Sequence, residues 1–246
     1  MTKAQPTLES IERVPGSPPQ LSEGDLYDIA ATYADAFAGE PWNEFTRCSG
    51  DGRFYGKDTT SGQPCPDGDG GVLELAYPRK ETADYIAREL TRPDVSLFLL
   101  RKMGGIAGFG WGFSYASPEA FAKDKYRTPE MKQTVVSLLG RSGITGKFYY
   151  LSEVGLADDP NIRGRGLSRG FLAGWLQVAR ELQLPALLRT SCSGPMYRTS
   201  QAAGMKQIMG PEVVVDTKTR AFIPTGRIIN GVSDTENSQR VLFVAT

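Results

Sequence analysis

Four elements in a fixed order between residues 148 and 188 constrain the fold more than any other part of the sequence. The apolar run from Phe148 to Leu156 predicts a strand, and a loop that contains two glycines follows it. A helix with one apolar face comes next, and the short run from Ala186 to Leu188 predicts a second buried strand. Because a connecting helix of this length favours parallel strands, we expect a mixed α/β sheet. The apolar face of the helix consists of Leu167, Phe171, Leu172, Trp175, Ala179 and Leu182.

The remaining elements are expected on both sides of this series. Ser22 and Asp25 are spaced like the start of a helix, and Gly39 is expected to end that helix. Residues 1–20 contain four prolines and are expected to form a mobile segment, whereas residues 21–246 are expected to form one domain. The other expected elements are a helix at about 83–90, a β-hairpin at 95–100 and 106–113, a weakly helical segment from 117 to about 139, and strands at 213–215 and 241–244.

The segment from 46 to 71 is rich in Gly, Asp, Ser and Thr, which predicts turns in an ordered loop or an insertion. It contains Cys48 and Cys65, and the sequence leaves open whether they lie in a plain loop or form a local disulfide. Two cysteines without any histidine make a poor zinc site, so no metal is expected. Cys192 is expected to be a buried thiol. The aromatic residues near the segment are expected to anchor it to the core, namely Trp42, Phe45, Phe54 and Tyr55.

The composition excludes several classes of protein. The chain has no histidine, which excludes Ser-His-Asp and Cys-His mechanisms and removes the commonest nitrogen ligand for a metal. Acid-base chemistry must therefore use a carboxylate with a raised pKa, a tyrosine, a cysteine, a lysine or ordered water. The 28 basic and 28 acidic residues cancel, so no overall field attracts nucleic acid or an anionic membrane. No apolar stretch approaches the ~18 residues of a membrane span. Three cysteines form no dense disulfide framework, which agrees with a reducing compartment, so the expected location is the cytoplasm.

The loop between the strand and the helix is a candidate anion site. A helix begins with unpaired N–H groups and the positive end of its dipole, so a preceding glycine loop can wrap a diphosphate with backbone donors. Two arginines in the loop add charge-assisted contacts to phosphate oxygens. The spacing matches neither the dinucleotide fingerprint nor the Walker loop, which weakens both of those classes. The loop consists of Arg163, Gly164, Arg165, Gly166, Leu167 and Ser168.

The loop and its flanks resemble motif A of the GNAT superfamily of N-acetyltransferases, whose pattern is Gln or Arg, any two residues, Gly, any residue, then Gly or Ala. Arg163 and Gly166 match this pattern, and Ser168 occupies its last position. The run from Leu151 to Leu156 resembles the family's fourth strand, and the pair 204–205 occupies its Gly-Phe position. The resemblance covers roughly residues 147 to 206. It implies an α/β (α+β) fold with a mixed, mostly antiparallel central sheet flanked by helices.

The resemblance also implies roles for individual residues. Backbone groups of the strand Val154, Gly155 and Leu156 would pair with the pantetheine arm of acetyl-coenzyme A, and Glu153 would accept the proton of the amine. Desolvation on an apolar strand would raise the pKa of Glu153, although this side chain can also face solvent or pair with an arginine. Ser200 occupies the position of the family's usual acid, a tyrosine. Tyr197, on the same helical face, can substitute for it or can be a packing residue.

The sequence therefore predicts an N-acetyltransferase that moves acetyl from acetyl-coenzyme A to a primary amine of a small molecule or peptide by direct attack. One alternative is a coenzyme A-binding module that senses acyl-coenzyme A without turnover, and another is a protein that binds a different phosphate ligand such as a nucleotide. No nucleic acid or membrane partner is expected. The oligomeric state is left open, with a homodimer as the candidate.

Overall fold

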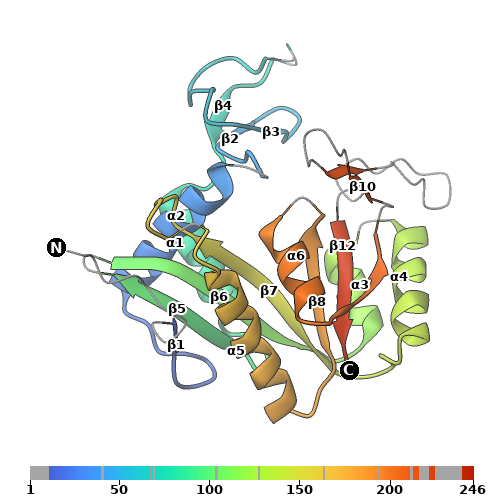
Figure 1. Cartoon of the computed structure of the whole chain (residues 1–246). Coiled ribbons are helices and arrows are strands. Elements are labelled where there is room, and N and C mark those ends of the chain that lie inside the picture. Colours follow the sequence, from blue (N-terminus) through green and yellow to red (C-terminus); the bar gives the residue numbers. More distant parts are fainter. Residues whose placement is uncertain are drawn as a thin grey trace. The chain divides into compact units, whose positions relative to one another are not determined.

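A computed structural model describes residues 11–39, 42–66, 68, 70–102, 105–126, 128–162, 164–192, 194–210, 213–215, 222–224 and 240–246 (Figure 1). Its described residues form a seven-stranded sheet in the order β1-β5-β6-β7-β8-β12-β9. Strands β7 and β8 pair in parallel, whereas the pairs β1-β5, β8-β12 and β12-β9 are antiparallel, which confirms the mixed, mostly antiparallel sheet. The strands are β1 (Ile11–Arg13), β5 (Ser96–Lys102), β6 (Gly105–Tyr115), β7 (Phe148–Leu156), β8 (Ala186–Ser191), β9 (Lys206–Met209) and β12 (Arg240–Ala245).

The chain divides into two compact units. The first contains Met1–Trp111 and Glu153–Phe171, and the second contains Gly112–Ser152 and Leu172–Thr246. Each unit is described separately below. Residues 1–10 of the predicted mobile segment lie outside the described residues, and residues 11–13 form β1. The division into a mobile segment and a single domain from residue 21 stays a prediction.

Two helices cover the sheet strands of the first unit. Helix α1 (Glu23–Ala38) begins as expected, because the Ser22 side chain accepts a hydrogen bond from the Asp25 backbone N–H and the Asp25 carboxylate accepts one from the Ser22 N–H. Its C-cap is Gly39, also as expected. Helix α2 (Arg79–Glu89) packs against α1. The Thr32 hydroxyl donates a 2.6 Å hydrogen bond to the carbonyl of Ile106, which joins α1 to β6.

The segment expected to be a loop forms a small three-stranded sheet in the first unit. It consists of β2 (Thr46–Cys48), β3 (Phe54–Tyr55) and β4 (Leu73–Leu75), with β2 in the centre and both pairs antiparallel. The expectation of turns alone was wrong, because strands of two or three residues leave almost no periodic signal in a sequence. Figure 1 shows this sheet as a separate lobe beyond the C-terminal end of α1.

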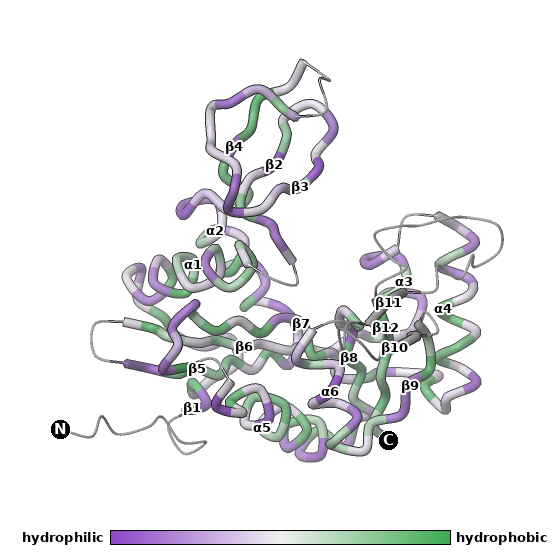
Figure 2. The backbone as a smooth tube through the Cα atoms, turned by 45° about the horizontal axis from the view of Figure 1, so that its top comes forward, coloured by the Kyte–Doolittle hydropathy of each residue, from purple (hydrophilic) through white to green (hydrophobic). Residues whose placement is uncertain are grey.

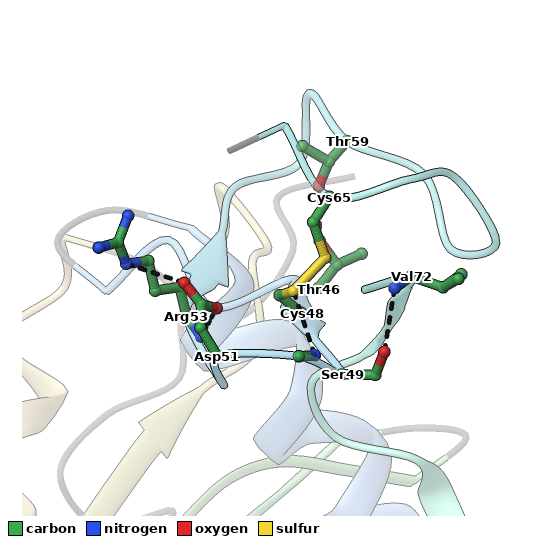
Figure 3. Close-up of a disulfide and its surroundings, with 9 residues drawn as sticks. Thr46, Cys48, Ser49, Asp51, Arg53, Thr59, Cys65 and Val72 are labelled. Atoms are coloured by element: carbon green, nitrogen blue, oxygen red, sulfur yellow. Dashed lines mark hydrogen bonds and ion pairs between the residues drawn. A yellow bond between two sulfur atoms is a disulfide. The ribbon is translucent and has the colours of Figure 1, made fainter. Parts of the chain in front are cut away.

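A disulfide between Cys48 and Cys65 holds the small sheet together (Figure 3). The two cysteines and Leu73 form a buried cluster, and Tyr55 packs against it. A Cβ atom on Gly71 would lie 2.7 Å from the Cys48 Sγ, so glycine is required where the chain passes the disulfide. Of the two alternatives left open by the sequence, the structure has the local disulfide.

The second unit places two more helices between β6 and β7. The weakly helical segment is in fact two helices, α3 (Pro118–Lys125) and α4 (Pro129–Arg141), which pack against each other. Ser117 caps α3 and Thr128 caps α4, each followed by a proline at the first helical position. Proline cannot extend a preceding helix, which explains the break. Helix α6 (Pro195–Ala202) and a two-stranded sheet of β10 (Val213–Val215) and β11 (Phe222–Pro224) complete this unit.

Helix α5 (Leu167–Glu181) begins in the first unit and continues in the second. Its predicted apolar face is buried, with exposed fractions between 0% and 3% at Leu167, Phe171, Leu172, Trp175 and Ala179. Leu182 was wrongly included in the apolar face, because α5 ends at Glu181 and the Leu182 side chain is 37% exposed.

Figure 2 shows hydrophobic residues along strands of the sheet, and hydrophilic residues that alternate with hydrophobic ones along α4. No helix within the described residues has the length and apolar character needed to span a bilayer.

Thiol titration tests the disulfide. In denaturant without reductant, one of the three cysteines, Cys192, is expected to react, and all three are expected to react after reduction. The double variant Cys48→Ser, Cys65→Ser is expected to destabilise the small sheet by up to about 3 kcal/mol, because loop closure then costs entropy on folding. Hydrogen exchange of the β2 to β4 amides measures this loss. Three reactive thiols before reduction would contradict the disulfide.

Candidate functional site

The predicted strand, loop and helix lie in the expected order, and from Glu153 to the start of α5 they belong to the first unit. Strand β7 has the predicted bounds and α5 begins at Leu167. Arg163 lies outside the described residues, and Ser168 is partly buried in the first turn of α5.

Both described glycines of the loop have left-handed backbone conformations. The φ angle is +76° at Gly164 and +74° at Gly166, and a Cβ atom on either residue would meet no other atom within 4 Å. Both residues and Arg165 between them are exposed. The glycines are therefore required by their φ angles, which L side chains rarely adopt, in an open stretch of surface.

The start of α5 presents unused backbone donors. The Arg169 N–H closes the first turn with a 3.0 Å hydrogen bond to the Gly166 carbonyl. Within the described part of the chain, no hydrogen bond uses the N–H groups of Gly164, Arg165, Gly166 or Leu167. Four amides at the positive end of a helix dipole, with Arg165 in the exposed loop and Arg169 in the first turn of α5, form a suitable site for an anion.

The chain between β7 and this loop is held by backbone and side-chain contacts within the first unit. The Ala157 N–H donates to the Ala107 carbonyl at 3.0 Å, and the Asp158 N–H donates to the Asp35 carboxylate at 2.5 Å. The Ile162 N–H donates to the Asp159 carbonyl at 2.8 Å, and the Ile162 side chain is 2% exposed. The approach to the glycines is therefore fixed before any ligand binds.

Two aspartates precede the loop, and each is paired with a lysine. Lys57 Nζ lies 2.9 Å from Asp158 Oδ2, and Lys102 Nζ forms an ion pair with Asp159. The hydrogen bond from Lys102, followed by those from the backbone and side chain of Asn161, lowers the pKa of Asp159 to about 2. Sequence reasoning missed these residues, although consecutive aspartates before Pro160 are a turn signal.

Glu153 is half-buried in β7 and acts on a tyrosine of α1. Burial raises the pKa of Tyr33 well above its usual value, and the charge of Glu153 is the next largest cause. The Glu153 carboxylate is therefore near enough to the Tyr33 hydroxyl to influence its pKa. Its role as a base stays a prediction.

Gly155 has a clear packing role. A Cβ atom there would lie 2.4 Å from Cζ of Phe109 on β6 and 3.0 Å from Ala36 on α1. Gly108 on β6 is restricted on the opposite face of the sheet, because its Cβ would lie 2.6 Å from the Leu156 side chain. The strand needs glycine for this approach, and contacts of Val154, Gly155 and Leu156 with a cofactor stay a prediction.

Tyr33 lies at the centre of a group of aromatic side chains, which sequence reasoning treated only as helix core. The 42–77 segment reaches this group: Trp42 contacts Phe37 at 5.5 Å between ring centroids, and Phe54 stacks on Tyr77 at 6.3 Å. Trp42 therefore anchors the segment to α1, as expected. Phe54 is 39% exposed and stacks on a residue of the same segment, and Tyr55 packs on the disulfide.

The other candidate catalytic residues lie on α6 in the second unit. The Tyr197 ring packs on Phe243 with centroids 5.5 Å apart, and its hydroxyl donates to Gln207 Oε1 at 3.3 Å and accepts from Gln201 Nε2 at 3.2 Å. This is the geometry of a packing residue with a satisfied hydroxyl. Ser200 is fully buried, and its Oγ has no hydrogen-bond partner among the described residues. Cys192 is buried outside the disulfide, as expected.

Comparison with known proteins identifies the fold. No family model and no curated protein matches the sequence. The structure resembles the polyamine N-acetyltransferase of Drosophila melanogaster, with 13% identity over 96% of this chain and 99% of that chain and a TM-score of 0.50. It is also similar to a mosquito protein like arylalkylamine N-acetyltransferase, with 13% identity over 96% of this chain and 99% of that chain and a TM-score of 0.49. A third similar structure is Arabidopsis thaliana NAA60 with acetyl-CoA, with 14% identity over 66% of this chain and 82% of that chain and a TM-score of 0.40. The chain has the fold of the GNAT N-acetyltransferases.

The pairing of Asp159 can be tested by its titration. Because the pKa of Asp159 is lowered to about 2, its stabilising contribution is present above the unfolded pKa of about 3.9 and is lost as the pH falls toward 2. In Lys102→Met the pKa of Asp159 is expected to rise toward its usual value, as measured by NMR of the carboxyl group. Lys57→Met, which removes the partner of Asp158, is the control and should leave Asp159 unchanged. Equal values in all three proteins would contradict the ion pair.

Proposed function

We propose that this protein transfers the acetyl group of acetyl-coenzyme A to a primary amine of a small molecule or peptide. The observation that carries the proposal is the set of unused N–H groups at Gly164, Arg165, Gly166 and Leu167, at the start of the helix that follows β7 in a GNAT fold. These donors suit the diphosphate of coenzyme A. Arg163, Arg165 and Ser168 would add contacts to its phosphates, and the β7 backbone at 154–156 would hold the pantetheine arm.

The reaction would proceed by direct attack. Glu153 takes a proton from the ammonium group, directly or through water, and the amine nitrogen then forms a bond to the thioester carbonyl carbon. The nitrogen, positively charged after the attack, gives up a second proton. The carbon–sulfur bond breaks, and the thiolate takes a proton as coenzyme A leaves. Tyr197, Ser200 or water would supply this proton.

The Drosophila enzyme of the same fold forms N-acetylagmatine, which supports an amine as the acceptor. The engaged hydroxyl of Tyr197 favours, as a second candidate, a module that binds acyl-coenzyme A without turnover. Release of coenzyme A in the presence of amines separates the enzyme from the binding module.

A homodimer and a cytoplasmic location stay predictions. The Cys48–Cys65 disulfide weighs against a reducing compartment.

The anion loop is tested by Gly166→Asp. Aspartate adds a negative charge beside the amides and cannot adopt φ +74° without strain, so binding of acetyl-coenzyme A should be lost in calorimetry. Gly143→Asp is a matched control, because Gly143 also has a positive φ, +87°, and open space around its Cβ, but follows α4 in the second unit. Unchanged binding in Gly166→Asp would refute the loop assignment.

The base is tested by Glu153→Gln. Removing the proton acceptor should lower kcat by about 100-fold or more and leave the affinity for acetyl-coenzyme A nearly unchanged. The fall in activity at low pH should also disappear from the kcat/KM profile. A variant with normal kcat, or one in which cofactor affinity falls as much as kcat, would assign Glu153 a different role.

A further inference from the structure

The aromatic group around Tyr33 has properties of a ligand site. The distances from the ring centroid of Tyr33 to the other ring centroids are 4.5 Å for Phe37, 5.0 Å for Tyr77, 5.6 Å for Phe109 and 6.2 Å for both Tyr85 and Trp111. Phe109 and Trp111 are fully buried, whereas the rings of Tyr77 and Tyr85 are half-buried and reach the surface. The group is therefore closed on the β6 side and accessible on the side of the two outer tyrosines.

Two polar groups in this cluster have no hydrogen-bond partner among the described residues. The Trp111 Nε1–H is buried without an acceptor. No hydrogen bond between described residues uses the hydroxyl of Tyr33, a residue that is 6% exposed. Buried polar groups are usually hydrogen-bonded, so the buried Trp111 Nε1–H indicates that a ligand or water completes it.

Two carboxylates act on the same hydroxyl. After burial, Glu153 raises the pKa of Tyr33 most, followed by Tyr85, Tyr77 and Glu44, and none of these groups is cationic. Glu44 comes from the segment after α1, where its N–H donates to the Phe37 carbonyl at 2.9 Å. Its carboxylate accepts a hydrogen bond from the Tyr77 hydroxyl, which holds it beside the aromatic rings. The two carboxylates that influence the Tyr33 hydroxyl therefore come from two segments, β7 and the chain after α1.

We propose that this site, formed by Tyr33, Glu44, Tyr77, Tyr85 and Glu153, binds an acceptor with two basic nitrogens, namely a short aliphatic diamine. The proposal rests on the proposed acetyl transfer and defines its acceptor. The reacting nitrogen lies at Glu153, which takes its proton. The second nitrogen stays protonated at Glu44, where the carboxylate and the faces of Tyr77 and Tyr85 stabilise an ammonium group. An acceptor with a carboxylate at the second position is repelled by Glu44.

Three compounds of equal chain length test the charge requirement. They are 1,4-diaminobutane, 1-aminobutane and 4-aminobutanoate, which carry at the far end an ammonium, a methyl and a carboxylate group. With saturating acetyl-coenzyme A, kcat/KM is expected to be about tenfold higher for the diamine than for the monoamine, and lowest for the amino acid. Diamines with three to six carbons, each paired with its monoamine, cover the unknown distance between the two nitrogens.

The variant Glu44→Gln tests the assignment of the second nitrogen. Glutamine keeps an oxygen for the Tyr77 hydroxyl and loses the charge, so the ratio of kcat/KM for diamine over monoamine is expected to fall toward one. Glu74→Gln is the matched control, since Glu74 is exposed on β4 of the small sheet that follows Glu44, and it should keep the wild-type ratio. If Glu44→Gln does not fold, Tyr33→Phe keeps the ring contacts and should raise the KM of the diamine by several-fold.

The outcomes separate this proposal from the proposed function. Equal kcat/KM for diamines and monoamines, or an unchanged ratio in Glu44→Gln, overturns the diamine site while acetyl transfer stands. Calorimetry of 1,4-diaminobutane with the coenzyme A-bound wild-type protein gives an answer without turnover, and no binding across the diamine series also overturns the site. Diamine binding that depends on Glu44, without any release of coenzyme A from acetyl-coenzyme A, supports the site and refutes the enzyme.

Discussion

The direct contact between β6 and β7 is the constraint on which the rest of the first unit depends. Because Gly155 has no side chain, the Phe109 ring lies against the β7 backbone on the face of the sheet that Ala36 of α1 also approaches, and Gly108 allows the Leu156 side chain to approach β6 on the other face. The same ring stacks on Tyr33 with centroids 5.6 Å apart. One contact therefore positions both the strand that carries Glu153 and the tyrosine whose hydroxyl that carboxylate influences. A larger residue at either glycine would move both together.

The same contact directs the chain toward the anion loop. Beyond Leu156, the backbone bonds from Ala157 to Ala107 and from Asp158 to Asp35 continue the attachment to β6 and α1. The acidic side chains at 158 and 159 would repel a diphosphate if they were unpaired, but Lys57 and Lys102 balance them. The loop thus combines a fixed approach, a locally balanced charge and unused donors, which is the preorganisation that binding of an anion requires.

The sequence predicted the parts of this arrangement that depend on neighbouring residues. The cap at Ser22, the apolar face of α5 and the bounds of β7 follow from local spacing, and the fold followed from a motif of six residues. Contacts between distant segments were not predictable in the same way. The pairing of Cys48 with Cys65, the bond between Tyr77 and Glu44, and the position of Lys57 beside Asp158 depend on tertiary structure, which leaves no periodic trace in one sequence. The inclusion of Leu182 in the apolar face of α5 was wrong for a related reason, because the end of a helix is set by the turn that follows it.

The absence of histidine determines how a proton could move in the first unit. Tyr33 is at the centre of the aromatic group, but burial and the nearby carboxylates raise its pKa well above the usual value, so it stays neutral near pH 7. A neutral phenol can donate or accept a hydrogen bond and cannot act as a base. Glu44 is held by the Tyr77 hydroxyl, which suits a fixed charge that binds a cation. Glu153, on β7 before the loop, stays the predicted proton acceptor, and burial is the physical means by which a carboxylate can take over the role of a histidine.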